Sequence, residues 1–227
     1  MCFTPLLSLF IAIIEFFLAT AMLLFFRKTK LRNFFALFIY LLGIYQFTEY
    51  MLCSGDIEFW GKIGFITYTF LPALYLQGIL RYLRIKIREI LLYVVPIIFA
   101  FFAAIIPGFI IGGKCYGPVV GVKVLLFQPA LNTGLIASLI YWTYYFGFLL
   151  AGCYLLYRDY IKQKNYVRKE IDILGIIGFL SMFVPTVMLI IIFPALSSMF
   201  PSILCKFAFL LAITAFVGAY LDSRLPH

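Results

Sequence analysis

The sequence predicts an all-α fold, a polytopic membrane bundle of seven transmembrane helices that forms one domain over residues 1–227. Three observations predict it. The 227-residue chain is 65% hydrophobic and only 12% charged, whereas soluble domains carry about 25% charged residues. Its mean hydropathy is +1.10. Seven separate apolar stretches fill most of the chain, and each has roughly the 20 residues that cross a hydrocarbon core about 30 Å thick.

Each stretch is expected to be a helix, because a backbone in lipid must pair every N–H and C=O within its own segment. We expect spans at residues 6–26, 33–53, 63–80, 90–111, 134–157, 173–196 and 202–221. The first span ends at Arg27, lacks a basic start and is followed by positive charge, so it is predicted to be a retained span rather than a cleaved signal peptide. The second ends before a Ser54–Asp56 turn, and Pro72 should kink the third.

Proline also marks the later spans. Pro96 lies inside the fourth span and Pro185 inside the sixth, where each is expected to bend the helix. The longest loop, 112–133, separates the fourth span from the fifth, and its apolar stretch Val119–Phe127 is too short to cross a membrane. We expect this stretch to lie on the membrane surface or to cap the bundle as a lid or hairpin. The seventh span follows a Pro201 turn.

The formal net charge of +9 follows the predicted spans and does not indicate a nucleic-acid partner. Fourteen of the 18 Lys and Arg residues lie after spans one, three, five and seven, all on one side of the membrane. The positive-inside rule predicts that this side is cytoplasmic, with the N-terminus outside and the C-terminus inside. We therefore predict a multi-pass protein of the cell membrane whose basic loops contact anionic membrane lipids.

Glu15 lies near the middle of the first span, where an ionisable side chain is costly and marks function by default. Ser8, Ala12, Glu15 and Ala19 share one helical face, so we expect the carboxyl group to point into a helix contact lined by small residues. Two interpretations stay open for Glu15: a structural hydrogen bond, or a role in binding a proton or a ligand.

Glu49 and Lys206 are expected at similar depth below the outer surface, near the outer ends of the second and seventh spans. Gln46 and Cys53 share the helical face of Glu49. Pairing Glu49 with Lys206 would remove two unpaired buried charges, and the result would be either a structural ion pair or a polar ligand pocket under the outer loop. Further polar residues that could join such a pocket are Gln128, Asn132, Tyr141, Tyr144 and Tyr145.

The cysteines form a second pattern. Cys2, Cys53, Cys115 and Cys205 are all expected near the outer face, which predicts one or two disulfides, with Cys115 the best candidate for membership. The connectivity stays open, because four cysteines allow three pairings. The chain has no CxxC motif and a single histidine, at its last residue, so we expect no metal site, no cofactor and no histidine-dependent catalysis.

The chain resembles a family of uncharacterised prokaryotic seven-span membrane proteins that open with Met-Cys-Phe-Ser. The opening here is Met1-Cys2-Phe3-Thr4, Gln46 and Glu49 match a Gln-x-x-Glu motif late in the second span, and Cys205 matches a cysteine early in the last span. The chain departs from the family's glycine, tryptophan and phenylalanine at three positions, Tyr50, Cys53 and Lys206. The resemblance implies a shared seven-span fold.

A second resemblance is to the N-terminal seven-transmembrane sensor region of histidine kinases. It rests on the order of a basic loop, an apolar span and a third span with a Pro-x-x-x-Leu-like pattern at Leu71–Leu76. This resemblance implies a sensory role. The residues after Asp222 are too few for a kinase or PAS domain, so we expect any signal to pass through a partner protein.

The leading functional hypothesis is an integral membrane sensor or receptor-like module that binds a small molecule, or senses the state of the membrane, from the outer side. The expected ligand-binding residues are Glu49, Gln46, Lys206, Glu15, Tyr141, Tyr145 and Asn132. Two alternatives stay open: a membrane thiol-redox enzyme that uses the outer cysteines, and a small proton-linked transporter that uses Glu15 and Glu49. An enzyme is the less favoured interpretation, and we assign no catalytic residues.

Overall fold

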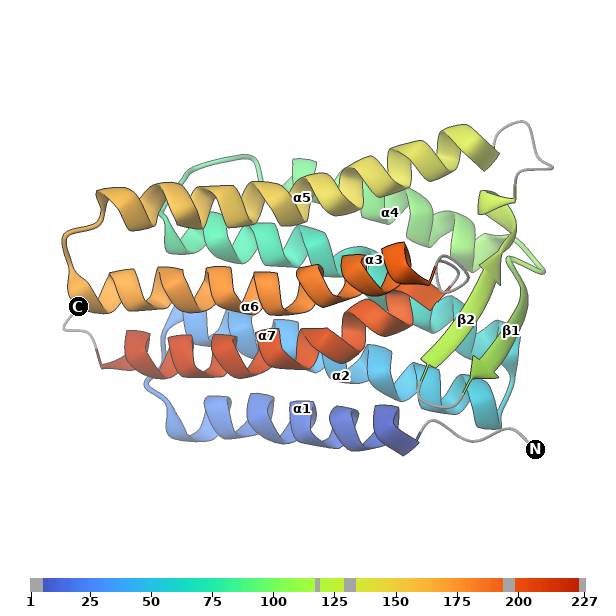
Figure 1. Ribbon diagram of the computed structural model, residues 1–227, viewed down its shortest axis with the longest axis horizontal. Helices are drawn as coiled ribbons and strands as arrows, with labels where there is room; N and C mark the ends of the chain where they lie inside the picture. Colours follow the sequence, from blue (N-terminus) through green and yellow to red (C-terminus); the bar gives the residue numbers. More distant parts are fainter. Residues whose placement is uncertain (1–5, 117–118, 129–133, 194–198, 225–227) are drawn as a thin grey trace.

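The described part of the chain is a bundle of seven α-helices with a β-hairpin at one end (Figure 1). The computed structural model describes residues 6–116, 119–128, 134–193 and 199–224. The helices are α1 Leu6–Phe25, α2 Lys30–Ser54, α3 Ile57–Tyr82, α4 Ile90–Ile105, α5 Gly134–Lys162, α6 Tyr166–Ile192 and α7 Phe200–Ser223. The strands are β1 Ile110–Tyr116 and β2 Val119–Val124, and a short 3₁₀ helix, η1 Leu125–Phe127, follows them.

Six of these helices are long and apolar enough to cross a membrane, whereas α4 has only 16 residues. At 1.5 Å per residue α4 is about 24 Å long, which is shorter than a hydrocarbon core of about 30 Å. The predicted fourth span, 90–111, is therefore too long. Pro107 disfavours helical geometry at Ile106, which is extended (ψ 117°), and Gly108 then takes a left-handed φ of +66°. The backbone has left the helix before residue 110.

Polar caps explain why several helices begin earlier than hydropathy predicts. The Asp56 carboxylate accepts a hydrogen bond from the Phe59 N–H, so α3 begins at Ile57 rather than near residue 63. The Asn165 side chain likewise accepts from the Arg168 N–H and starts α6 at Tyr166 rather than near 173. These first turns carry charged residues, so a window of apolar residues does not include them.

The loop predicted at 112–133 contains an antiparallel hairpin, which is a small addition to an otherwise α-helical bundle. β1 pairs with β2 from Ile110–Val124 to Tyr116–Val119, with one irregularity between Ile110 and Gly112. Phe109, fully buried, and Ile110 pack with Ala103 of α4 in a small apolar cluster, which anchors the first strand. A hairpin that caps the bundle is one of the forms that the sequence predicts for the apolar stretch Val119–Phe127.

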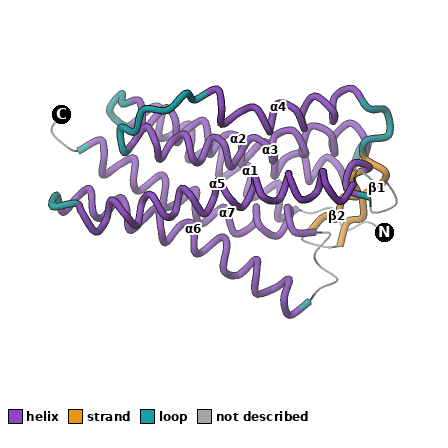
Figure 2. The backbone as a smooth tube through the Cα atoms, turned by 90° about the horizontal axis from the view of Figure 1, so that it is seen from above, coloured by secondary structure: helices purple, strands orange, loops and turns teal. Residues whose placement is uncertain are grey.

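The helices run lengthwise along the bundle, although α6 slants away from the others toward its C-terminal end, and the hairpin lies across one end of the bundle (Figure 2). We call this end the hairpin end, and the opposite end, with the connections before α2, α4 and α6, the basic end. α3 is the central helix, since 83% of its apolar window is buried, against 22% for α6. Close contacts hold α3 against α2, since a Cβ added to Gly78 of α3 would come within 2.4 Å of the Phe34 ring of α2.

Candidate functional site

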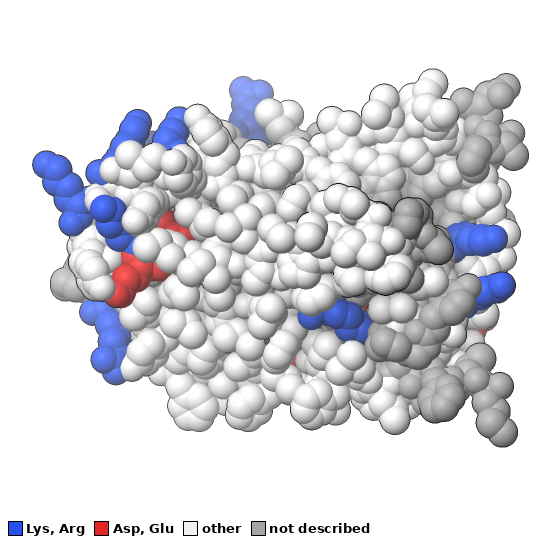
Figure 3. Space-filling view, in the orientation of Figure 1, with Lys and Arg blue, Asp and Glu red and all other residues white. Residues whose placement is uncertain are grey.

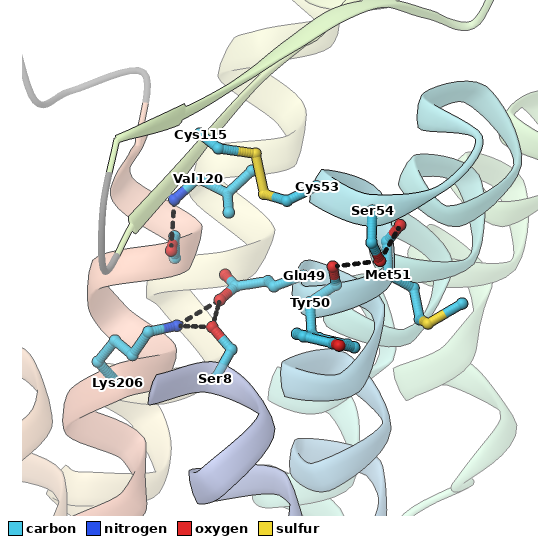
Figure 4. The surroundings of a disulfide bond; sticks show 10 residues. Ser8, Glu49, Tyr50, Met51, Cys53, Ser54, Cys115, Val120 and Lys206 are labelled. Atoms are coloured by element: carbon cyan, nitrogen blue, oxygen red, sulfur yellow. Dashed lines mark hydrogen bonds and ion pairs between the residues drawn. A yellow bond between two sulfur atoms is a disulfide. The ribbon is translucent and has the colours of Figure 1, made fainter. Parts of the chain in front are cut away.

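A polar cluster joins α1, α2 and α7 near the hairpin end (Figure 4). The Lys206 ammonium forms an ion pair with Oε2 of Glu49. It also donates to Ser8 Oγ at 2.8 Å and to Gln46 Oε1 at 2.9 Å. Ser8 donates in turn to Glu49 Oε2 at 3.1 Å, and Gln46 Nε2 donates to the Cys205 carbonyl at 2.7 Å. The predicted meeting of Glu49, Gln46 and Lys206 is thus present.

This cluster is buried. The side chains of Lys206 and Glu49 are only 11% and 5% exposed, and Ser8 and Gln46 are fully buried. A lysine ammonium has three N–H donors, and here all three meet an acceptor. Buried charges are tolerated when they are paired and hydrogen-bonded. The cluster therefore satisfies Lys206 completely, and one oxygen of Glu49 with it.

The second oxygen of Glu49 is different. Oε1 is buried and has no hydrogen-bond partner among the described residues. In Figure 4 it points away from Lys206, toward the hairpin. Since Oε2 is held by Lys206 and Ser8, the carboxylate plane cannot turn freely, and Oε1 keeps this direction.

Glu49 borders a cavity of about 420 Å³ that lies beneath the hairpin. Residues of α2, α3, α5, α7, β2 and η1 line the cavity, and its walls are mainly apolar, with several aromatic rings. The principal rings are Tyr45, Trp60, Phe65, Tyr68, Tyr141 and Trp142. Small-molecule sites typically have volumes of about 300–1,000 Å³ with apolar and aromatic walls and a few polar groups. The size and lining of this cavity fit that description.

Polar groups are sparse on the cavity wall. The Tyr68 hydroxyl is buried and has no hydrogen-bond partner in the described part of the chain, while the Tyr141 hydroxyl shares a 3.0 Å hydrogen bond with Thr69. Tyr145 stacks on Tyr68 at a ring-centre distance of 4.5 Å and lies behind the wall. Of the residues predicted to join a pocket, Gln128 and Tyr141 line the cavity, and Asn132 falls outside the described residues.

Two bonds hold the hairpin over the cavity. A disulfide joins Cys115 of β1 to Cys53 at the end of α2, with their Cα atoms 6.1 Å apart. On the other strand, the Val120 N–H donates to Ser202 Oγ of α7 at 3.0 Å. The prediction that Cys115 forms a disulfide is therefore confirmed for the pair with Cys53. Cys205 is a buried free thiol, and Cys2 lies outside the described residues.

Glu15 is fully buried but does not join the hydrogen-bonded cluster. Both of its carboxyl oxygens lack a partner among the described residues. The predicted face of α1 is present, since Ser8, Ala12, Glu15 and Ala19 are all fully buried. Ser8 reaches Glu49, whereas Glu15 lies seven residues further along α1, or about 10 Å deeper at 1.5 Å per residue.

Several cavity residues were not singled out from the sequence. Trp60, Tyr68, Ser138 and Trp142 line the cavity, and Ser8, assigned only to the face of Glu15, bonds to Glu49 and Lys206. Ser8 carried a usable signal, because it is a polar residue at a depth that matches Glu49. The aromatic residues carried none, since the chain holds 27 Phe and 16 Tyr and most of them pack elsewhere.

The basic end holds a second acid–base pair. Arg81 donates through Nε to Glu89 Oε1 at 2.8 Å, and Gln77 donates to the other oxygen of Glu89. The hydrogen bond from Arg81 is the main cause that lowers the pKa of the Glu89 carboxyl from its ordinary value. Burial opposes it, and the hydrogen bond from Gln77 and the charge of Arg81 add to the lowering. This pair is about half exposed, at 49% for Arg81 and 42% for Glu89.

In the described ranges no three His, Cys, Asp or Glu side chains lie together in a way that could hold a metal ion. A scan against models of known protein families finds no family that matches the chain. A search of curated proteins finds no match either. The two family resemblances therefore stay predictions, and the functional argument rests on the geometry of the hairpin end.

Proposed function

We propose that this chain is a multi-pass membrane protein that acts as a receptor-like module and binds a small molecule in the cavity under the hairpin. The observation that carries the proposal is the cavity itself: about 420 Å³, walled by aromatic rings and bordered by the buried Glu49 carboxylate. A site with these features is the default binding hypothesis in a protein of unassigned function.

Placement in a membrane is supported by the six long apolar helices and by the side chains that cover the bundle. Many large apolar residues face outward, among them Phe10, Phe17, Leu24, Ile90, Phe101, Leu135 and Ile191. On the face drawn in Figure 3, Lys and Arg gather mainly at the basic end. We propose that the basic end is cytoplasmic, where it contacts anionic lipids, and that the hairpin end is outside.

We extend the proposal from binding to sensing because three helices that line the cavity also reach the basic end. α2, α3 and α5 each contribute to the cavity and then continue to the basic end. A ligand that contacts all three helices and the hairpin would change the packing free energy of elements that reach the opposite end. We propose that a partner protein receives this change on the cytoplasmic side.

A proton-linked transporter is the second candidate, and one observation favours it. Two buried carboxyl groups, Glu15 and Glu49, lie on α1 and α2, and one ammonium faces them from α7, that of Lys206, whose side chain is 11% exposed. An isolated ionised carboxylate is very costly in an apolar interior, so the excess acid would hold a proton. Proton uptake by liposomes that contain the protein, abolished in Glu15→Gln, would favour transport over sensing.

The test of binding is a thermal-unfolding screen in lipid nanodiscs with a panel of small aromatic compounds. A compound at 100 times its Kd should add about 2.7 kcal/mol to the free energy of unfolding. Ser138→Phe places a ring inside the cavity and should abolish the gain, whereas Ala104→Phe on the exposed face of α4 should not. A gain that persists in Ser138→Phe, or no gain with any compound, would count against the cavity as a site.

A further inference from the structure

The geometry of Glu49 points to the chemical class of the ligand, and the inference rests on the proposed binding role. We infer that the cavity takes an uncharged molecule with a flat apolar body and one O–H or N–H group, and that this group donates a hydrogen bond to Oε1 of Glu49. Three properties of the site support this class of ligand: its acceptor, its charge and its shape.

The acceptor comes first. Glu49 borders the cavity, and its Oε1 is buried and has no partner among the described residues. A buried polar atom without a hydrogen bond costs about 1–3 kcal/mol, so a ligand that supplies a donor gains from satisfying it. The neighbouring Tyr45 hydroxyl lies close to the Glu49 carboxylate and is the nearest internal competitor for a ligand donor. Oε1 itself has no partner among the described residues, so a ligand donor that reaches it meets an unsatisfied acceptor.

The charge comes second. Glu49 is already neutralised by Lys206, whose three donors are all used within the cluster. A cationic ligand would bring a second positive charge to a carboxylate that is already paired. The exposed Lys123 on the cavity lining adds further positive charge. Since an unpaired charge is expensive to bury, an uncharged donor is favoured over an ammonium group.

The shape comes third. The Tyr68 and Tyr141 rings lie on one wall, and Trp60 and Trp142 also border the space. Aromatic walls favour a flat apolar body through offset or edge-to-face contacts. A ligand with one donor and a fused or substituted ring would use these walls together with the Glu49 acceptor.

The experiment compares three probes of similar shape: 2-naphthol, which is a neutral donor, 2-methylnaphthalene, which has no donor, and 2-naphthylmethylamine, which is a cation. Affinities are measured in nanodiscs by calorimetry. The heat measured with the Ser138→Phe variant, whose cavity is filled, reports partition of the probe into lipid and is subtracted as background. We expect 2-naphthol to bind at least about tenfold more tightly than 2-methylnaphthalene. A factor of about ten is the lower end of the range for a hydrogen bond to a charged group. The amine should bind more weakly than 2-naphthol.

Two variants assign the preference to its atom. Glu49→Leu combined with Lys206→Met removes the acceptor without leaving an unpaired charge, and it should bring 2-naphthol and 2-methylnaphthalene to equal affinity. Tyr45→Phe removes only the neighbouring hydroxyl and should keep the preference. The wild-type comparison needs no variant, so it decides the donor requirement even where the double variant does not fold.

The outcomes separate the two proposals. Equal affinity of wild type for 2-naphthol and 2-methylnaphthalene, or a preference that survives in the double variant, would overturn the donor inference and leave the cavity as a binding site. Tighter binding of the amine would overturn the uncharged class. Binding of none of the three probes above the Ser138→Phe background would overturn the binding role itself.

Discussion

The two ends of the bundle hold the same three kinds of side chain in opposite surroundings. At the hairpin end, Glu49, Lys206 and Gln46 form a trio that is almost wholly buried. At the basic end, Glu89, Arg81 and Gln77 form a trio whose two charged members are about half exposed. In each trio the glutamine bonds to one member of the ion pair. The chemistry is the same, and exposure to water differs.

That difference determines what each trio can contribute. Water can hydrate the exposed pair and weakens its attraction, so it mainly holds the connection between α3 and α4. Water cannot take the place of a lost partner in the buried trio, and Oε1 of Glu49 has no partner among the described residues. Burial therefore makes the hairpin end sensitive to substitution, and under the proposed binding role it would make that end selective for its ligand.

Breaking the buried pair is the largest expected effect. Lys206→Met or Glu49→Gln alone leaves its partner charge uncompensated, and each should lower the free energy of unfolding by roughly 3–5 kcal/mol. The double variant should recover part of this loss. Thermal unfolding in detergent measures all three, and strictly additive losses would show that the two residues do not interact.

The matched pair at the basic end provides the contrast. Arg81→Met and Glu89→Gln should each cost only about 0.2–1 kcal/mol, as for exposed ion pairs, and less at high salt. A loss at this end as large as that at the hairpin end would refute the claim that burial distinguishes the two trios.

Removing the disulfide is the second largest expected effect. Cys53→Ser with Cys115→Ser should cost about 2–4 kcal/mol, because the bond closes a loop with a sequence separation of 62 residues. The hairpin would keep its Ser202 contact but lose its tie to α2. Cys153→Ser, a partly buried free thiol, is the control and should change stability little. Identical melting of the double variant and wild type would argue against the bond.

Two tyrosines on the cavity wall sharpen the comparison within the hairpin end. Tyr141→Phe removes the hydrogen bond with Thr69 and should cost about 1 kcal/mol. Tyr68→Phe removes a buried hydroxyl that has no partner in the described residues, and it should be nearly neutral or slightly stabilising. Unfolding midpoints of the two variants test this order, and a larger loss for Tyr68→Phe would reverse it.

The smallest effect is the pH dependence of the basic end. Because the pKa of Glu89 is lowered in the folded state, its contribution is fully present above its ordinary value of 4.5 and is lost as pH falls through the folded pKa. The exposure of the pair keeps this contribution small. The wild type should have a higher free energy of unfolding than Arg81→Met at about pH 7. This difference should shrink toward zero as the pH is lowered to about 3. A difference that grows on acidification would contradict the sign.

How far the sequence could predict this site depends on the type of residue. Glu49 and Lys206 were paired from sequence because lipid makes an unpaired charge very costly, so few arrangements are acceptable. Cys115 was recognised because an apparently isolated loop needs an anchor. In each case one strong physical requirement acts on a few residues.

A pocket under the outer loop was one of two predicted outcomes, but its aromatic lining was not predicted, because aromatic residues satisfy many environments in a membrane protein. Tyr68 lines the cavity and Tyr157 is exposed, and hydropathy does not separate the two. The extent of the fourth helix was missed for a related reason. The segment Ile105–Ile111 is apolar whether it is helix or strand, and only Pro107 and Gly108 signalled the break. Apolar content alone does not distinguish a short helix followed by a hairpin from a full span.

The most direct test of the central claim is thiol labelling of Ser138→Cys in intact cells with a membrane-impermeant methanethiosulfonate reagent, relative to the unchanged chain. The account predicts labelling from outside at this cavity position, slowed by any compound that stabilises the protein in the unfolding screen. Arg88→Cys at the basic end should react only after permeabilisation, and Ala104→Cys on the exposed apolar face of α4 in neither condition. Ser138→Cys that stays unreactive, or reacts only after permeabilisation, would contradict a ligand cavity open to the outer side.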